Sequence, residues 1–156
     1  MFSFVKPLIF GLDPEAAHDL AIKSLKLNVV PESIFKVENE EMLETTFLED
    51  KIKNPIGMAA GFDKSAEVFN SLYKLGFGFV EVGTITPKKQ LGNPKPRIFR
   101  LEEDEALINR LGFNNDGLEV ATKRLKSGWS SKQGILGVNI GPNYDSSSYE
   151  YDFCKC

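Results

Sequence analysis

The chain is poor in residues that bind metals or form cross-links. Its two cysteines, Cys154 and Cys156, stand together at the end of the 156 residues, and His18 is the single histidine. A C-x-C pair without further cysteines or a nearby histidine argues against zinc and against a disulfide framework. We therefore expect reduced thiols on a frayed tail, no metal site, and His18 on a helix surface.

Long apolar runs and an excess of one charge are also missing. No stretch approaches the ~20 apolar residues of a membrane span. Pro7, Gly11 and Asp13 interrupt the start, where a signal peptide would need an apolar region. A formal net charge of −3 without a long run of like charges gives no reason to expect nucleic acid as a partner. What remains is the composition of one ordinary soluble domain.

The front of the chain, to about residue 44, reads as a helical segment. Asp13 is a typical N-cap and Pro14 suits the first helical position. A further short helix is expected after Pro31. A hairpin around Glu49 and Asp50 follows and leads into the rest of the chain.

Strands and helices alternate from residue 56 onward. Strands are expected at residues 56–61, 78–83 and 135–141, and helices at 64–76 and 116–128. Such alternation is typical of parallel βαβ units. Each strand ends at a glycine that polar or turn-forming residues follow. Because ligands bind at the carboxyl ends of parallel strands, we expect the three segments to form one site.

The stretch NPIGMAAGFDKSAE, residues 54–67, has the pattern of one wall of that site. Its apolar run 56–59 predicts a buried strand, and Gly61 permits a sharp turn or the close approach of a ligand. Asp63 suits a helix cap, which places Lys64 at the mouth of the strand.

The connection between Gly83 and Asn109 is far longer than the ~2–6 residues of ordinary βα loops. Its segments IFRL and ALINR predict a hairpin, and their alternation argues against disorder. Ordered connections of this length are usually functional. The basic stretch between Lys88 and Arg100 is more commonly a solvated face.

Six stretches, in this order, resemble the quinone-dependent (class 2) dihydroorotate dehydrogenase family: LDPEAAHDLAIKSLK, NPIGMAAGFDKSAE, GFGFVEVGTITP, GNPKPRIFRL, INRLGFNNDG and GVNIGPN. Together they cover nearly everything from residue 8 to residue 143. The pair NPKPRIFRL and INRLGFNN is far more specific than a lone glycine motif. The resemblance implies an FMN-dependent flavoprotein oxidoreductase of de novo pyrimidine (UMP) biosynthesis. Such an enzyme oxidises dihydroorotate to orotate and passes the electrons to a quinone.

The resemblance also implies the fold, an incomplete (β/α)8 TIM-type barrel with about three of its eight parallel strands. Residues 1–44 would be an N-terminal helical segment associated with membrane and quinone, and residues 45–156 the N-terminal portion of the FMN-binding barrel. The catalytic serine base is expected beyond residue 156, so no residue here is assigned to it. We expect the chain alone to be truncated, inactive and aggregation-prone. Its ending after Asn143 departs from the family pattern and predicts no helix.

The resemblance assigns particular residues to the two ligands. Those implied to contact FMN are Ala60, Gly61, Phe62, Asp63, Lys64, Thr84 and Asn139. Those implied to hold the orotate-like substrate are Lys64, Asn109, Arg110, Leu111, Gly112 and Phe113. The residue types suit this chemistry, because a backbone without bulky side chains admits a flat ring and an asparagine matches an imide edge. A lysine ammonium suits the flavin edge where reduction accumulates negative charge.

Each of these residues also has an ordinary structural interpretation. Lys64 would be a surface lysine in a first helical turn, and Asn139 a polar strand end. Arg110 would pair with the acids at 102–105, Gly112 would serve a turn, and Phe62 and Phe113 would belong to a core. The ordered set of six motifs favours the functional interpretation for the group as a whole.

The first dozen residues raise the question of a membrane. Their apolar side chains suit an interfacial anchor: Phe2, Phe4, Val5, Leu8, Ile9 and Phe10. No basic patch assists, so the sequence alone favours packing onto the barrel. The resemblance instead implies a peripheral membrane protein at the cytoplasmic face of the inner cell membrane.

Two other hypotheses stay open at this point. One is another FMN barrel oxidoreductase, of the soluble dihydroorotate or dihydropyrimidine dehydrogenase type. The other is a non-catalytic remnant.

Overall fold

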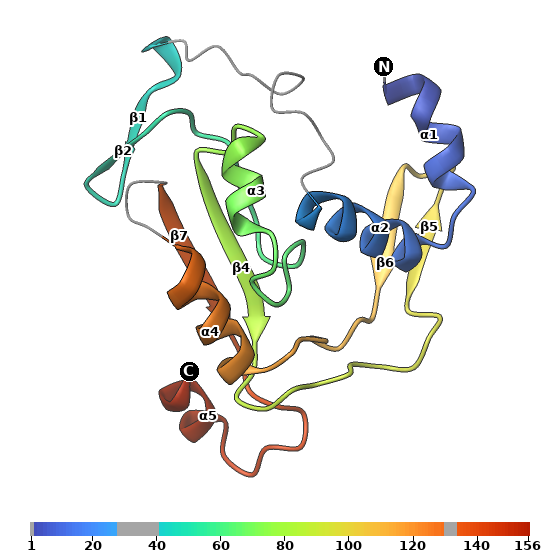
Figure 1. The fold of residues 1–156 in the computed structure, drawn as a ribbon. Helices are drawn as coiled ribbons and strands as arrows, with labels where there is room; N and C mark the ends of the chain where they lie inside the picture. The colour runs from blue at the N-terminus through green and yellow to red at the C-terminus, as the bar shows by residue number, and fades with distance from the viewer. Residues whose placement is uncertain (1, 28–40, 130–133) are drawn as a thin grey trace.

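A short parallel sheet lies at the centre of the computed structural model, which describes residues 2–27, 41–129 and 134–156. Its strands, in spatial order, are β3 (Gly57–Met58), β4 (Phe79–Ile85) and β7 (Ile135–Ile140). Helices α3 (Phe69–Lys74) and α4 (Leu118–Gly128) lie against this sheet and separate the strands in sequence (Figure 1). The predicted alternation of three parallel strands with helices is confirmed.

The described residues of the N-terminal part form helices, as predicted. These are α1 (Phe2–Phe10), α2 (Pro14–Lys26) and the 3-10 turn η2 (Glu41–Leu43). Asp13 caps α2, because its Oδ1 accepts hydrogen bonds from the amides of Glu15 at 3.0 Å and Ala16 at 2.9 Å. The helix predicted after Pro31 lies outside the described residues. None of the described helices is long and apolar enough to cross a membrane.

Two antiparallel hairpins leave the central sheet. The first, β1 (Thr45–Phe47) with β2 (Asp50–Ile52), is the hairpin predicted around Glu49 and Asp50. The second, β5 (Ile98–Leu101) with β6 (Ala106–Asn109), is the predicted excursion and lies beside α1 and α2 (Figure 1). Arg100 of β5 links this second hairpin to the end of α1 and the segment before α2, because its Nη1 donates to the carbonyls of Phe10 at 3.0 Å and Leu12 at 2.8 Å.

The core forms where α3 and α4 meet β4. Leu72, Val80 and Val82 have no exposed surface, and Ala121 is 1% exposed. Helix α2 adds Ile22 and Leu25 to the same cluster. The N-terminal helical segment therefore shares a core with the sheet, and the division after residue 44 stays a prediction.

The first predicted strand and helix are much shorter than expected. β3 has two residues, and Ile56 is 65% exposed rather than buried. The helix begins at Phe69 instead of residue 64, because the buried Asp63 carboxylate accepts the amides of Glu67 and Val68 at 2.7 and 2.8 Å. Ala66, with a φ of 55°, could not lie inside a right-handed helix. Asp63 thus caps the turn before α3 rather than the helix itself.

The ends of the later elements also differ from the prediction. β4 runs through Gly83 to Ile85, so Gly83 does not end the strand. The prediction of no helix after Asn143 is wrong: α5 (Tyr149–Lys155) follows, and Ser148 caps it by accepting the amide of Tyr151 at 3.2 Å. The two cysteines therefore belong to a helical end and not to a frayed tail; both are free thiols.

Candidate functional site

A cavity of about 580 Å³ opens where the three parallel strands end; we call it the strand-end cavity. Its walls come from the segment after β3, the end of β4, the end of β7 and the loop after β6. The lining residues are Ala60, Gly61, Lys64, Gly83, Thr84, Asn93, Asn109, Arg110, Leu111, Gly112, Phe113, Asn114 and Asn139. The structure thus brings together all the residues singled out in the sequence except Phe62 and Asp63.

The ends of β4 and β7 are tied to each other by side chains. The Thr84 hydroxyl donates to Asn139 Oδ1 at 2.6 Å, and Asn139 Nδ2 donates to Glu81 Oε1 at 3.2 Å. These bonds fix the orientation of the Asn139 amide. A threonine and an asparagine that are 55 residues apart therefore present a defined donor–acceptor pattern to the cavity.

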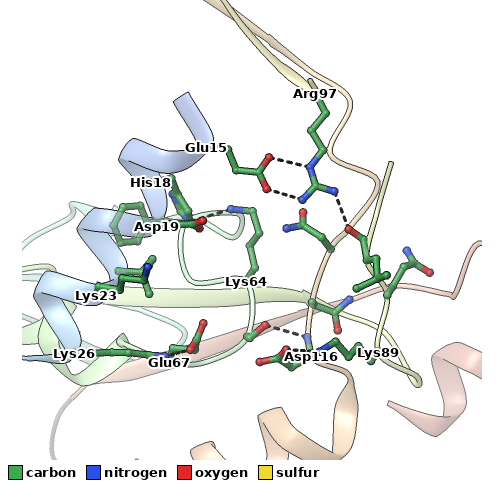
Figure 2. A pocket seen from close by; sticks show the side chains of 17 residues that line it. Glu15, His18, Asp19, Lys23, Lys26, Lys64, Glu67, Lys89, Arg97 and Asp116 are labelled. Carbon is green, nitrogen blue, oxygen red and sulfur yellow. Dashed lines mark hydrogen bonds and ion pairs between the residues drawn. The ribbon is translucent and has the colours of Figure 1, made fainter. Parts of the chain in front are cut away.

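Lys64 occupies the meeting point of three cavities rather than a helix surface. It lines the strand-end cavity, a cleft of about 420 Å³ under α2, and a cavity of about 760 Å³ between α1, α2 and the β5–β6 hairpin. Its Nζ lies 3.0 Å from His18 Nε2. Figure 2 shows the Lys64 side chain extending toward α2, which carries His18. The interpretation of Lys64 as a surface lysine is therefore wrong.

Burial changes the protonation of both partners in this contact. It lowers the pKa of Lys64, although the carboxylates of Glu15 and Asp19 act in the opposite direction. Burial, and next the charge of Lys64, lower the pKa of His18. A neutral His18 with an unprotonated Nε2 can accept a hydrogen bond from the Lys64 ammonium.

Phe62 and Asp63 point away from the strand-end cavity. The Phe62 ring packs edge-on against His18, with centroids 5.3 Å apart, and lines the cleft under α2. His18 is thus half-buried against Phe62 and Lys64, which corrects the prediction of a surface histidine. Asp63 is 1% exposed, and its two oxygens accept the backbone amides that precede α3.

The loop 109–113, which lines one side of the strand-end cavity, is held by hydrogen bonds to its backbone. Gln90 Nε2 donates to the Gly112 carbonyl at 3.0 Å, and Asn115 Nδ2 to the Phe113 carbonyl at 2.8 Å. Arg110 Nη2 donates to the Pro96 carbonyl at 3.1 Å, and its guanidinium lies 5.9 Å from the Phe99 ring centre. These contacts hold the Arg110 side chain against its own hairpin.

Sequence reasoning missed the buried polar side chains that bond the backbone of this loop or bond one another beside it. Thr86, Gln90, Asn115 and Asn143 are all buried, between 0% and 6% exposed. Asn143 Nδ2 lies 3.2 Å from the Thr86 hydroxyl and 3.1 Å from Gln90 Oε1, and its own amide donates to Asp152 at 2.9 Å. The signal was present in the sequence, since GFNN and GPN each place an asparagine just after an element that enters the site.

The cavity between α1, α2 and the β5–β6 hairpin, which we call the helix–hairpin cavity, is the most apolar of the three. Its lining residues are Lys6, Phe10, Pro14, Glu15, His18, Gly61, Lys64, Ile98, Arg100, Leu101, Glu102, Glu105, Ala106, Leu107, Asn109 and Leu111. It shares Gly61, Lys64, Asn109 and Leu111 with the strand-end cavity. The two cavities are therefore neighbours on either side of Lys64.

Comparison with known proteins gives one consistent result. The family model described as "Dihydroorotate dehydrogenase" matches residues 42–156. A "Dihydroorotate dehydrogenase (quinone)" from Erythrobacter litoralis is 48% identical over 153 residues, which are 98% of this chain and 43% of the relative. One of the same name from Sinorhizobium fredii is 53% identical over 145 residues, 93% of this chain and 39% of the relative. The chain thus spans about two fifths of these relatives.

Solved structures agree with the sequence matches. A DHODH from Eimeria tenella in complex with ferulenol superposes with a TM-score of 0.81 at 44% identity, covering 94% of this chain and 42% of that one. The ligand-free type gives a TM-score of 0.80 at 47% identity, covering 90% and 40%. These likenesses confirm the predicted fold class, because the three parallel strands of this chain superpose on part of a barrel enzyme.

Proposed function

Because the chain belongs to the dihydroorotate dehydrogenase family, we propose that it forms the FMN-facing and substrate-facing part of a quinone-dependent dihydroorotate dehydrogenase. The reaction is the oxidation of dihydroorotate to orotate in pyrimidine biosynthesis. The observation that supports the proposal most directly is the strand-end cavity, in which Lys64, Thr84, Asn109 and Asn139 line one space.

The residues of the strand-end cavity suit FMN. At Gly61, with a φ of 104°, a Cβ atom would meet no other atom within 4 Å, so the backbone there borders open space that a flat ring can enter. Ala60 and Gly61 would lie against the ring, and the fixed side chains of Thr84 and Asn139 would bond its polar edge. When bound, FMN supplies the acceptor for the hydride.

Lys64 and the loop 109–113 would hold the substrate beside the cofactor. Asn109 and Arg110 are exposed residues that line the strand-end cavity. Asn109 can bond the imide edge of orotate, and Arg110, one of whose N–H groups bonds the Pro96 carbonyl, would offer its remaining donors to the carboxylate. The Lys64 ammonium would place positive charge where negative charge develops. Phe62 and Asp63 would support this site from behind. The base that removes the C5 proton is not assigned to any residue of this chain.

The helix–hairpin cavity would receive the quinone. Its walls are largely apolar, as a prenylated ring requires, and Lys64 separates it from the strand-end cavity. The exposed Leu8 and Phe10 of α1 would lie at the membrane surface, which makes the protein a peripheral one at the cytoplasmic face of the inner membrane. The side chains of Phe2, Phe4 and Val5 lie outside the described part of the structure.

Titration of the 156-residue chain with FMN, followed by flavin fluorescence, tests the proposal. We expect a 1:1 complex, with Asn139→Leu and Thr84→Val weakening FMN binding about tenfold, the effect of one or two lost hydrogen bonds. Thr45→Val, which removes an exposed hydroxyl from β1, is the matched control and leaves the affinity unchanged. Failure to bind FMN would contradict the proposal and favour a non-catalytic remnant.

The electron acceptor distinguishes the classes of enzyme. Dihydroorotate oxidation with a quinone, and not with fumarate or NAD, is the expected result for protein that turns over. Turnover by the 156-residue chain by itself would contradict the expectation that it is inactive alone. Preference for fumarate or NAD would place it with the soluble FMN oxidoreductases instead.

A further inference from the structure

Arg97 is a buried arginine whose donors are divided between two parts of the molecule. It is 7% exposed, and its Nε and Nη2 donate to the two carboxylate oxygens of Glu15 on α2, at 3.0 and 2.5 Å. Its Nη1 donates to the carbonyls of Leu91 at 2.7 Å and Asn93 at 2.9 Å. Figure 2 shows this fork between helix α2 and the loop that follows β4. A planar guanidinium can hold a carboxylate and two carbonyls together, whereas a lysine ammonium lacks this geometry.

The segment 91–93 that Arg97 holds is itself bonded to the loop 109–113. The Asn93 amide donates to the Leu111 carbonyl at 3.0 Å, and Asn93 Nδ2 donates to the Arg110 carbonyl at 2.7 Å. The amide of Arg110 donates to the carbonyl of Arg97 at 2.9 Å. An unbroken series of hydrogen bonds therefore runs from α2 through Glu15, Arg97 and Asn93 to the loop.

We infer that Arg97, held by Glu15, is a positioning residue through which the docking of helix α2 sets the geometry of the loop 109–113. The proposed function, on which this part of the inference rests, makes the loop 109–113 the substrate-facing one; the hydrogen bonds themselves do not depend on it. The N-terminal helices, which border the helix–hairpin cavity, thereby influence the strand-end cavity next to it. The docking of α2 and the ordering of the loop 109–113 are then coupled, so that a change in one changes the other.

Glu15 is the informative residue because it lies on α2, and among the described residues its side chain has no hydrogen bond to the backbone of the loop 109–113. In the described part of the chain its side chain makes polar contacts with Arg97 and with Lys95, whose Nζ is 3.4 Å from Oε2. Among hydrogen bonds and ion pairs, an effect of Glu15 on the loop therefore passes through Arg97 or Lys95; the carboxylate also acts on Lys64 through space. The Lys95 side chain is 62% exposed, so its contact is screened by solvent and contributes little. The Glu15–Arg97 pair is buried, and removing one partner leaves an uncompensated charge.

Amide hydrogen exchange of the 156-residue chain tests the inference without any ligand. Glu15→Gln keeps the shape of the side chain and removes its charge. We expect the amides of Asn93 and Arg110 to exchange at least about tenfold faster, as loss of one charged hydrogen bond predicts. The exchange rates of the β4 amides should stay within about twofold of those in the parent chain. Lys95→Ala, which removes the exposed partner of the same carboxylate, should change neither region.

Two results would overturn the inference: unchanged exchange of these loop amides in Glu15→Gln, or equal acceleration in Lys95→Ala. If Glu15→Gln also accelerates β4, the milder Glu15→Asp decides, since it keeps the charge and shortens the reach. Faster exchange confined to the loop then supports the inference, and any other pattern refutes it.

A ligand experiment adds the functional consequence. In a chain that binds both ligands, Glu15→Gln should weaken the binding of orotate about tenfold. It should weaken the binding of FMN less than about twofold, because FMN would bond to the strand ends and not to the loop. Equal weakening of both ligands counts against a role confined to the loop. Failure of the parent chain to bind either ligand counts against the proposed function, whereas the inference depends on the exchange rates alone.

Discussion

Asp63 and Lys64 are neighbours in the sequence with opposite surroundings. The Asp63 carboxylate is turned inward and satisfies two backbone amides, while the Lys64 side chain reaches three cavities. Local sequence describes both as polar residues at a strand end. Only the three-dimensional structure separates the residue that shapes the turn from the residue that faces the cavities.

Replacing Asp63 with alanine should destabilise the fold. The variant leaves the part-buried amide of Glu67 and the buried amide of Val68 without an acceptor, and we expect the free energy of unfolding to fall by about 2 kcal/mol. Urea denaturation measures the change, with the exposed Asp104→Ala as control. If stability falls while FMN affinity does not, Asp63 belongs to the turn alone. A variant as stable as the parent would contradict the capping role.

The single histidine predicts a pH dependence. Burial, and next Lys64, lower the pKa of His18 below its usual 6.5, so the unfolded chain takes up the proton first as the pH falls. The contribution of neutral His18 is complete above about pH 6.5 and declines as the pH falls toward the lower folded-state pKa. His18→Gln should therefore flatten the loss of unfolding free energy between about pH 7.5 and 5.5.

Urea denaturation at several pH values checks this prediction. Glu15 and Asp116, whose pKa values their arginine partners lower, lose their contributions only below their usual values of 4.5 and 3.8. The lowered pKa of Lys64 also makes the free energy of unfolding fall as the pH falls, but this begins near the usual pKa of 10.5. Lys64 is still present in His18→Gln, so this part of the pH dependence is common to parent and variant. Identical slopes in parent and variant would show that His18 has no part in the pH dependence.

At the scale of elements, the pairing of β4 with β7 depends on Gly83. This residue lies within β4 at a φ of 113°, and a Cβ atom there would lie 2.4 Å from the Asn139 carbonyl oxygen. Gly83→Ala should therefore lower the free energy of unfolding by about 3 kcal/mol or more, from backbone strain and overlap together. The variant should also move the Thr84 hydroxyl away from Asn139 and weaken the binding of FMN.

Gly137→Ala is the matched control for this prediction. Gly137 lies in β7, has no positive φ, and its nearest neighbour would be the flexible Glu81 Cγ at 3.3 Å. We expect a change within about 1 kcal/mol. Thermal denaturation of both variants measures the difference, and equal losses would mean that the position of the glycine does not matter.

Elements with their own turn chemistry were predictable, and elements that depend on distant partners were not. Asp13 and Pro14 mark the start of α2, and the IFRL and ALINR segments pair as a hairpin. The start of α3 was missed because the Asp63 side chain captures the amides of the first predicted turn. α5 was missed because the ending was compared with a family pattern rather than with Ser148 as a cap.

For the molecule as a whole, the sequence predicted which strand ends converge but not what supports them. Asn109 and Asn139 were identified from motifs, and both line the strand-end cavity. Gln90, Asn115 and Asn143 were not, because their side chains bond segments that are distant in the sequence. Gln90 Nε2 donates to the Gly112 carbonyl, Asn115 Nδ2 to the Thr86 hydroxyl, and Asn143 Nδ2 to the Lys88 carbonyl. The motifs GFNN and GPN draw attention to Asn115 and Asn143, but the local sequence does not say which distant segment each side chain bonds.

Self-association is the property that the whole sheet predicts. β7 pairs with β4 on one side, and within residues 2–27, 41–129 and 134–156 no strand pairs with its other edge. Val138 and Ile140 on β7 are 43% and 37% exposed. An unpaired edge with exposed apolar side chains is a template for pairing with a second copy. We expect the chain to associate at concentrations on the order of 10 μM, and Val138→Lys to suppress this.

Light scattering at rising protein concentration measures the association, and Leu8→Lys is the matched control. Leu8 is 75% exposed on α1, against 43% for Val138, so this variant removes an even more exposed apolar side chain from a different surface while adding the same charge. If the edge of β7 is responsible, Val138→Lys raises the concentration at which scattering begins and Leu8→Lys does not. Equal effects of both variants would assign association to general hydrophobicity and net charge, and no effect of Val138→Lys would exclude the β7 edge.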